Sequence, residues 1–195
     1  PFAYASQDWH AIMLKELAES NRVSITANGG IKRVKYFASA SYNHVGDIFD
    51  GQDEGQGYIP AYGYDRLNIR ANFDFEITLT TKLAANFAGM YGLQTTPNRN
   101  SAALNGIFPA LTNLSGDTPI KVYEDGMPGT QDGRFNAANP WYDFNFTGTS
   151  SFPRTMINMD YTLTQKLDFV TKGLSFSGKL AYDNTFRNDG KSIGN

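Results

Sequence analysis

Cysteine is absent from this 195-residue chain, and histidine occurs only twice. Without cysteine the chain has no disulfide framework, no thiol nucleophile and no thiolate metal ligand. His10 and His44 lie on different segments, and no Ser-His-Asp arrangement or metal-ligand spacing can be assembled around either of them. The sequence therefore predicts no enzyme, no metal site and no cofactor.

An excess of one charge is also lacking, and so is a long hydrophobic run. The formal net charge of −2 gives no electrostatic reason to expect nucleic acid as a partner. No segment approaches the roughly 18 consecutive apolar residues of a transmembrane helix. Membrane-spanning strands stay open as an interpretation, because they are apolar at only every second position and give a weak hydropathy signal.

What the chain does have is strict alternation of apolar and polar side chains between residues 67 and 77. The apolar positions are Leu67, Ile69, Ala71, Phe73, Phe75 and Ile77. Successive side chains of a strand point to opposite faces, so this segment is expected to form a strand with one apolar and one polar wall. At roughly 3.3 Å per residue it spans about 36 Å, which after tilting covers the apolar band of about 25 Å in an outer membrane.

The same alternation recurs along the chain and predicts six strands, near 22–28, 34–43, 66–78, 83–92, 155–164 and 174–184. Gly29-Gly30 is expected to turn the chain after the first strand, and residues 6–19 are expected to form a helix capped by Ser6 or Asp8. Short turns alternate with long loops at 1–21, 44–65, 93–154 and 185–195. Up-and-down membrane barrels have this arrangement, with the long loops on the extracellular side.

The tyrosines fit two aromatic girdles, with Tyr42, Tyr91 and Tyr182 near the long loops and Tyr36 and Tyr161 near the short turns. The predicted fold is all-β: an antiparallel up-and-down transmembrane β-barrel segment of about six strands, with long extracellular loops and one short loop helix. Alternation alone does not distinguish this fold from a soluble ligand-binding or adhesive β-domain, such as a β-sandwich or lipocalin-like barrel whose apolar face points inward. A passive porin is a further alternative.

Two groups of residues are candidates for functional contacts. Polar strand residues are predicted to line the lumen and hydrate its wall: Asn68, Arg70, Asn72, Asp74, Glu76, Asn86, Asn158 and Asp160. Loop aromatics are the candidates for substrate contact, because flat rings stack on sugar faces: Tyr58, Tyr62, Trp141 and Tyr142. The alternative for the aromatic group is packing within the loops or against a partner protein.

The segment from Asp50 to Gly55 has some features of a calcium-binding loop. It fails as an EF-hand, because Ala61 stands where the bidentate glutamate belongs. Carboxylates of the outer loops could still hold Ca²⁺ in another arrangement.

Several short motifs, in this order, carry a resemblance to a known family: Asp8-Trp9, residues 23–30, 36–42 and 64–74, Asn139-Pro140 and residues 173–176. Their order and spacing resemble the barrel of SusC/RagA-type TonB-dependent outer-membrane transporters of Gram-negative bacteria. The resemblance implies a barrel of about 22 strands around a plug domain, energy supplied through TonB, and a SusD-like surface lipoprotein as a lid. It also implies import of glycans or peptides across the outer-membrane lipid. On that template the chain is a six-strand part of a longer protein, whose plug and TonB-contacting region lie in a missing N-terminal region.

Overall fold

The structure is a computed structural model that describes residues 8–98, 111, 122, 129, 139–188 and 190–193. Its elements are α1 (Trp9–Met13), β1 (Ser20–Ile31), β2 (Val34–Val45), β3 (Gly63–Glu76), β4 (Thr81–Pro97), α3 (Pro140–Phe146), β5 (Thr149–Lys166), β6 (Ser175–Arg187) and β7 (Lys191–Ile193).

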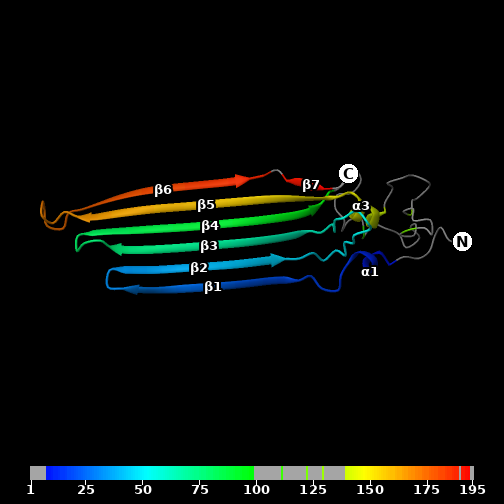
Figure 1. Ribbon diagram of the computed structural model, residues 1–195, viewed down its shortest axis with the longest axis horizontal. Helices are drawn as coiled ribbons and strands as arrows, with labels where there is room; N and C mark the ends of the chain where they lie inside the picture. The colour runs from blue at the N-terminus through cyan, green and yellow to red at the C-terminus, as the bar shows by residue number, and fades with distance from the viewer. Residues whose placement is uncertain are drawn as a thin grey trace.

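The six long strands lie side by side in the order of the sequence, and each is antiparallel to the next. Figure 1 shows the turns of the three hairpins at one end of the sheet, and α1 and α3 at the other end. The predicted up-and-down order of six antiparallel strands is therefore confirmed. Within the described residues the sheet is open, with β1 and β6 at its edges.

The predicted turn at Gly29-Gly30 is wrong, because both glycines lie inside β1 and the chain turns between Ile31 and Val34. Gly29 is the cross-strand partner of Tyr36, whose ring lies over it. A Cβ atom on Gly29 would stand 2.5 Å from the Tyr36 hydroxyl oxygen. Glycine at this position therefore makes room for an aromatic ring on the neighbouring strand, a known use of glycine in curved sheets.

The predicted helix over residues 6–19 is also wrong in extent, since α1 ends at Met13. Asp8, one of the two predicted caps, caps this helix, and Ser6 lies outside the described residues. The Asp8 carboxylate accepts hydrogen bonds from the backbone N–H groups of His10 and Ala11, both at 3.1 Å. Beyond the helix the backbone is extended and pairs with a distant loop. Leu14 forms a β-bridge with Phe49, and this tertiary pairing replaces the helical hydrogen bonds that the periodicity had predicted.

The strands extend further into the predicted long loops than alternation indicated. The loops predicted at 93–154 and 185–195 are too long, because β4 continues to Pro97, β5 begins at Thr149 and β6 continues to Arg187. Pro153 lies inside β5, next to the point where β6 gives way to β7 and the pairing register with β5 shifts by one residue. A bulge is one of the few places in a sheet where proline is tolerated, because no ladder hydrogen bond is lost there.

The buried apolar side chains described by the structure do not belong to the sheet. They form a loop cluster beside the long-loop end, made of Trp9, Met13, Phe49, Leu111, Trp141 and Phe144. The side chains on the sheet itself are exposed or half-buried over most of its length. Among the described residues the fold therefore consists of a long, largely exposed sheet with a small packed cluster at one end.

Candidate functional site

The register of the six strands sorts their side chains onto two faces. Directly paired residues share a face, and one row of partners across the sheet is Ala27, Ala38, Ala71, Phe87, Met159 and Tyr182. The neighbouring positions along each strand form the opposite row of Asn28, Phe37, Asn72, Asn86, Asp160 and Ala181. We call these the apolar face and the polar face.

All eight residues predicted to line a lumen lie on the polar face. Several are joined across strands by hydrogen bonds: Asn86 Nδ2 donates to Asp160 Oδ1 at 2.9 Å, and Asn158 Nδ2 donates to Asp183 Oδ1 at 2.6 Å. Lys179 Nζ lies 3.6 Å from the same Asp160 oxygen. Asn86, Asn158 and Asp160 therefore each have a polar partner on a neighbouring strand.

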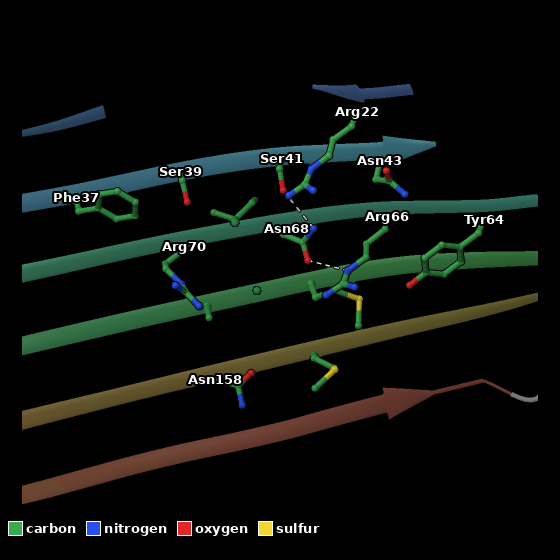
Figure 2. A pocket seen from close by; sticks show the side chains of 15 residues that line it. Arg22, Phe37, Ser39, Ser41, Asn43, Tyr64, Arg66, Asn68, Arg70 and Asn158 are labelled. Carbon is green, nitrogen blue, oxygen red and sulfur yellow. Dashed lines mark hydrogen bonds between the residues drawn. The ribbon is translucent and has the colours of Figure 1, made fainter. Parts of the chain in front are cut away.

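The polar face is also the hollowed face of the sheet. A hollow of about 680 Å³ lies over β1 to β5 towards the long-loop end, and its lining includes Arg22, Arg66, Arg70, Asn68 and Tyr64. Figure 2 shows Arg22 extending from β1 towards Ser41, and a hydrogen-bonded chain linking Ser41, Asn68 and Arg66. In that chain Asn68 Nδ2 donates to Ser41 Oγ at 3.3 Å and Arg66 Nε donates to Asn68 Oδ1 at 2.8 Å.

Sequence reasoning singled out Asn68, Arg70 and Asn158 of this hollow but missed Arg22 and Arg66. Both lie at the first position of their predicted strands, where the alternation is weakest as a signal. The spacing of each arginine from the apolar residues that follow it would have placed both on the polar face.

Of the predicted substrate-contacting aromatics, Trp141 belongs to the loop cluster, and Tyr62 and Tyr142 pack against it. Trp141 is only 3% exposed, and this burial leaves almost no ring surface for a ligand. Tyr142 stacks on Phe146 with ring centroids 4.8 Å apart. The ring of Tyr62 lies 5.7 Å from that of Phe49, while Tyr58 is half-buried. The structure thus favours the packing alternative for Trp141.

Buried and exposed carboxylates organise the loop between β2 and β3. The buried Asp47 carboxylate accepts hydrogen bonds from the backbone N–H groups of Phe49, at 2.9 Å, and Tyr62. Removal from water raises the pKa of Asp47 above its ordinary value, and the two backbone donors oppose that rise. Asp53 accepts from the N–H groups of Gly55, Gln56 and Gly57, so its charge is satisfied by the backbone.

Metal and membrane-helix signals are both missing from the described part of the chain. No group of three or more histidine, cysteine or acidic side chains lies close enough to hold a metal ion there. No helix in the same residues has the length and apolar character to cross a bilayer.

The apolar face ends in a polar cluster at the long-loop end. The Tyr42 hydroxyl donates to Asp65 Oδ1, and His44 Nδ1 lies 2.8 Å from the same oxygen. Tyr42 and Tyr91 belong to one row and Tyr36 and Tyr161 to another, nearer the hairpin turns.

Tyr182, predicted to lie at the level of Tyr42 and Tyr91, belongs instead to the row of Ala71, between the two tyrosine rows. Because β6 continues to Arg187, Phe186 is the residue of β6 that lies in the row of Tyr42 and Tyr91.

Comparison with known proteins identifies no relative: no family model, no curated protein and no solved structure matches this chain. The described residues form an antiparallel up-and-down sheet with a hollowed polar face and an exposed apolar face.

Proposed function

We propose that this chain forms part of the wall of a β-barrel in a Gram-negative outer membrane. Its apolar face contacts lipid, and its polar face lines a water-filled lumen. One observation carries the proposal: the hollow of the sheet lies on the polar face, while the apolar face is bare.

The exposure of the apolar face is the first support. Ile25 and Leu180 are each 70% exposed, and Tyr36, Ile69 and Tyr161 are each between 45% and 46% exposed. Full burial of one large apolar side chain stabilises a protein in water by about 1.5–3 kcal/mol. Soluble monomers rarely leave contiguous apolar patches of more than a few hundred Å² uncovered. A hydrocarbon solvent removes this cost.

The side on which the hollow lies is the second support. In a lipocalin-like barrel or a sandwich the apolar face is the inner one, packed or closed around an apolar cavity. Here most of the residues that line the hollow are polar, with arginine, asparagine and serine prominent, although Phe37, Met90 and Met156 also line it. Membrane barrels have this inverted distribution, polar inside and apolar outside.

The height of the apolar face is the third support. The stretch from Leu67 to Ile77 spans about 36 Å at roughly 3.3 Å per residue, and a tilt of about 45° reduces this to the 25 Å of an outer-membrane apolar band. At the long-loop edge of this stretch the apolar face ends in the Tyr42–Asp65–His44 cluster, in which Tyr42 is level with Leu67. Polar groups therefore begin on this face where such a band would end on the long-loop side.

The finer proposal is that the barrel is a SusC/RagA-type importer. It rests on the resemblance of the motifs together with the layout of short turns at one end and packed loops at the other. In this scheme the polar face contacts a plug and the passing glycan or peptide. The loop cluster meets a SusD-like lipoprotein, and TonB acts through an N-terminal region.

Single-cysteine labelling tests the membrane proposal cleanly, because the chain has no cysteine of its own. Residues 67–74 of β3 are replaced one at a time in the complete protein, spin-labelled and reconstituted in lipid vesicles. We expect accessibility to lipid-soluble oxygen at Leu67, Ile69, Ala71 and Phe73, and accessibility to a water-soluble nickel chelate at the positions between them. The opposite phase, or no dependence on lipid, overturns the proposal.

Uptake measurements separate an energised importer from a passive porin. Transport into cells that lack TonB is expected to fall to background for the importer. Undiminished diffusion of small solutes into those cells would contradict the SusC/RagA assignment. It would not contradict the proposal that the apolar face contacts lipid.

A further inference from the structure

The polar face carries a row of arginines that no single strand reveals. Arg22 is paired with Asn43, Asn43 with Arg66, Arg66 with Gly92, Gly92 with Arg154 and Arg154 with Arg187. This is one continuous row of partners from β1 to β6. All four arginine side chains are exposed. We call it the arginine row.

Strand spacing fixes the separations along the arginine row. Neighbouring strands lie about 4.8 Å apart, so Arg22 and Arg66 are about 10 Å apart at the backbone, as are Arg66 and Arg154. Arg154 and Arg187 are direct cross-strand partners. Four permanent positive charges thus share one level of the wall near its long-loop end, since the guanidinium group stays protonated in proteins.

No described carboxylate neutralises this level of the polar face. The adjacent polar-face rows contain Ser20, Tyr64, Gln94 and Phe152 on one side and Ser24, Ser41, Asn68, Met90, Met156 and Thr185 on the other. Among the described residues of this face the nearest acidic group is Asp183, which is two rows nearer the hairpin turns and accepts a hydrogen bond from Asn158. Like charges directly opposite each other destabilise a sheet, so the Arg154–Arg187 pair is held at a cost in stability unless an anion lies between them.

We propose that the arginine row binds the anionic groups of an acidic oligosaccharide, carboxylate or sulfate, on its way through the barrel. This rests on the proposed function and names its class of substrate. A planar guanidinium matches a carboxylate or sulfate through two parallel hydrogen bonds. A row at one level offers successive positions to a chain that carries one charge on each of several sugars.

The surroundings of the row favour a sugar over other anions. The hollow around Arg22 and Arg66 presents neutral hydrogen-bonding groups from Asn43, Ser39 and Ser41, and the ring of Tyr64 stands beside them (Figure 2). Hydroxyl-rich ligands need such neutral donors and acceptors, and a flat ring can stack on a sugar face. The arginine row supplies the charge, and these groups supply the contacts to the uncharged part of each sugar.

Binding to the complete protein in detergent tests the proposal. The probes are oligogalacturonate for carboxylate, chondroitin sulfate oligosaccharides for sulfate, a neutral malto-oligosaccharide of matched length, and a glutamate oligomer. Calorimetry is expected to show tighter binding of at least one acidic oligosaccharide than of the neutral one, with affinity falling as salt rises.

Arg66→Gln and Arg154→Gln are each expected to weaken acidic binding about tenfold or more, because each removes charge-assisted hydrogen bonds. Arg33→Gln, in the β1–β2 turn at the opposite end, removes the same charge far from the row and is expected to change nothing. A conservative Arg66→Lys should restore part of the affinity, since it keeps the charge but not the planar fork.

Three outcomes overturn the inference. Neither acidic oligosaccharide binds better than the neutral one; the arginine variants change neutral binding as much as acidic binding; or the glutamate oligomer is the preferred ligand. These results are independent of the membrane proposal. If β3 shows the alternating lipid accessibility but the protein has no preference for acidic oligosaccharides, only the present inference is refuted. If the protein does not contact lipid but binds acidic oligosaccharides through Arg66, only the membrane proposal is refuted.

Discussion

Enlarging Ala71 tests what the apolar face touches, because lipid and a packed core respond with opposite sign. Ala71 lies in the central row of that face, with Ala38 and Phe87 as its cross-strand partners. Ala71→Leu adds three carbon atoms to this surface. At about 0.8 kcal/mol for each methylene removed from water, and with partial contact to neighbours, the substitution is expected to stabilise a lipid-facing site by about 1–2 kcal/mol.

In a closed, packed core the larger side chain of the same substitution has no free space to occupy. Overpacking a filled interior costs about 1–3 kcal/mol. Ala71→Arg does not separate the two cases, because a charge is costly in either setting, about 2–4 kcal/mol at a bilayer midplane. Leucine is therefore the informative substitution.

The measurement is urea unfolding of the complete protein in lipid vesicles, with the folded fraction read from heat-modifiable migration on gels. A denaturant dependence of about 1–3 kcal/mol per molar converts the expected gain into an upward shift of the midpoint of about 0.5–1 M. Asn72→Leu is the matched control: it is the next residue, on the polar face between Phe37 and Asn86, and is expected to stay within about 0.5 kcal/mol. A lower midpoint for Ala71→Leu would refute the lipid-facing assignment.

Three further predictions concern the sheet and the loop cluster. Gly29→Ala is expected to lower sheet stability by about 1–3 kcal/mol, because its new methyl meets the Tyr36 ring; the loss should shrink in a Tyr36→Ala background, measured as a double-mutant cycle in vesicles. Asp47→Asn is expected to cost the loop about 1–3 kcal/mol, because an amide oxygen replaces a carboxylate that accepts two backbone N–H groups. Burial raises the pKa of Asp47 in the folded state, so the stability that this shift contributes is fully present below the ordinary pKa of 3.8 and is lost as pH rises through the folded pKa. Unfolding followed by tryptophan fluorescence at several pH values should show this decrease of stability with pH, and Asp47→Asn should remove the pH dependence. Trp141→Ala is expected to destabilise the loop cluster by about 3–5 kcal/mol, while the sheet keeps its heat-modifiable migration on gels. Loss of the loop cluster and the sheet together would show that they unfold as one unit.

Local chain properties were sufficient for much of this fold. Alternation with period two located the six long strands but not β7, which lies in the predicted loop 185–195. The lengths of the segments between the long strands predicted an antiparallel up-and-down order, because short connections allow only adjacent antiparallel neighbours. Asp8 was identified as a possible cap from its position alone. The boundaries were less certain, and β4 and β5 are longer at the long-loop end than their patterns indicated.

The sequence interpretation of Gly29-Gly30 was wrong, and that of Trp141 stayed open, where a distant partner decides the outcome. Gly29-Gly30 looks like a turn until Tyr36 is placed across from it. Trp141 could equally contact a ligand or pack in the loops until the loop cluster, with Trp9, Met13 and Phe49, is assembled around it. In both cases the deciding contact comes from another segment, so no local pattern contains it.

The sequence by itself determined that each strand has one apolar and one polar side, because side-chain direction in a strand depends only on position along it. Only the tertiary structure decided which strand positions lie at the same level, because register is a property of pairs of strands. The arginine row shows the difference. Arg154 and Arg187 fell outside the predicted strands, and pairing alone brings them onto one line with Arg22 and Arg66.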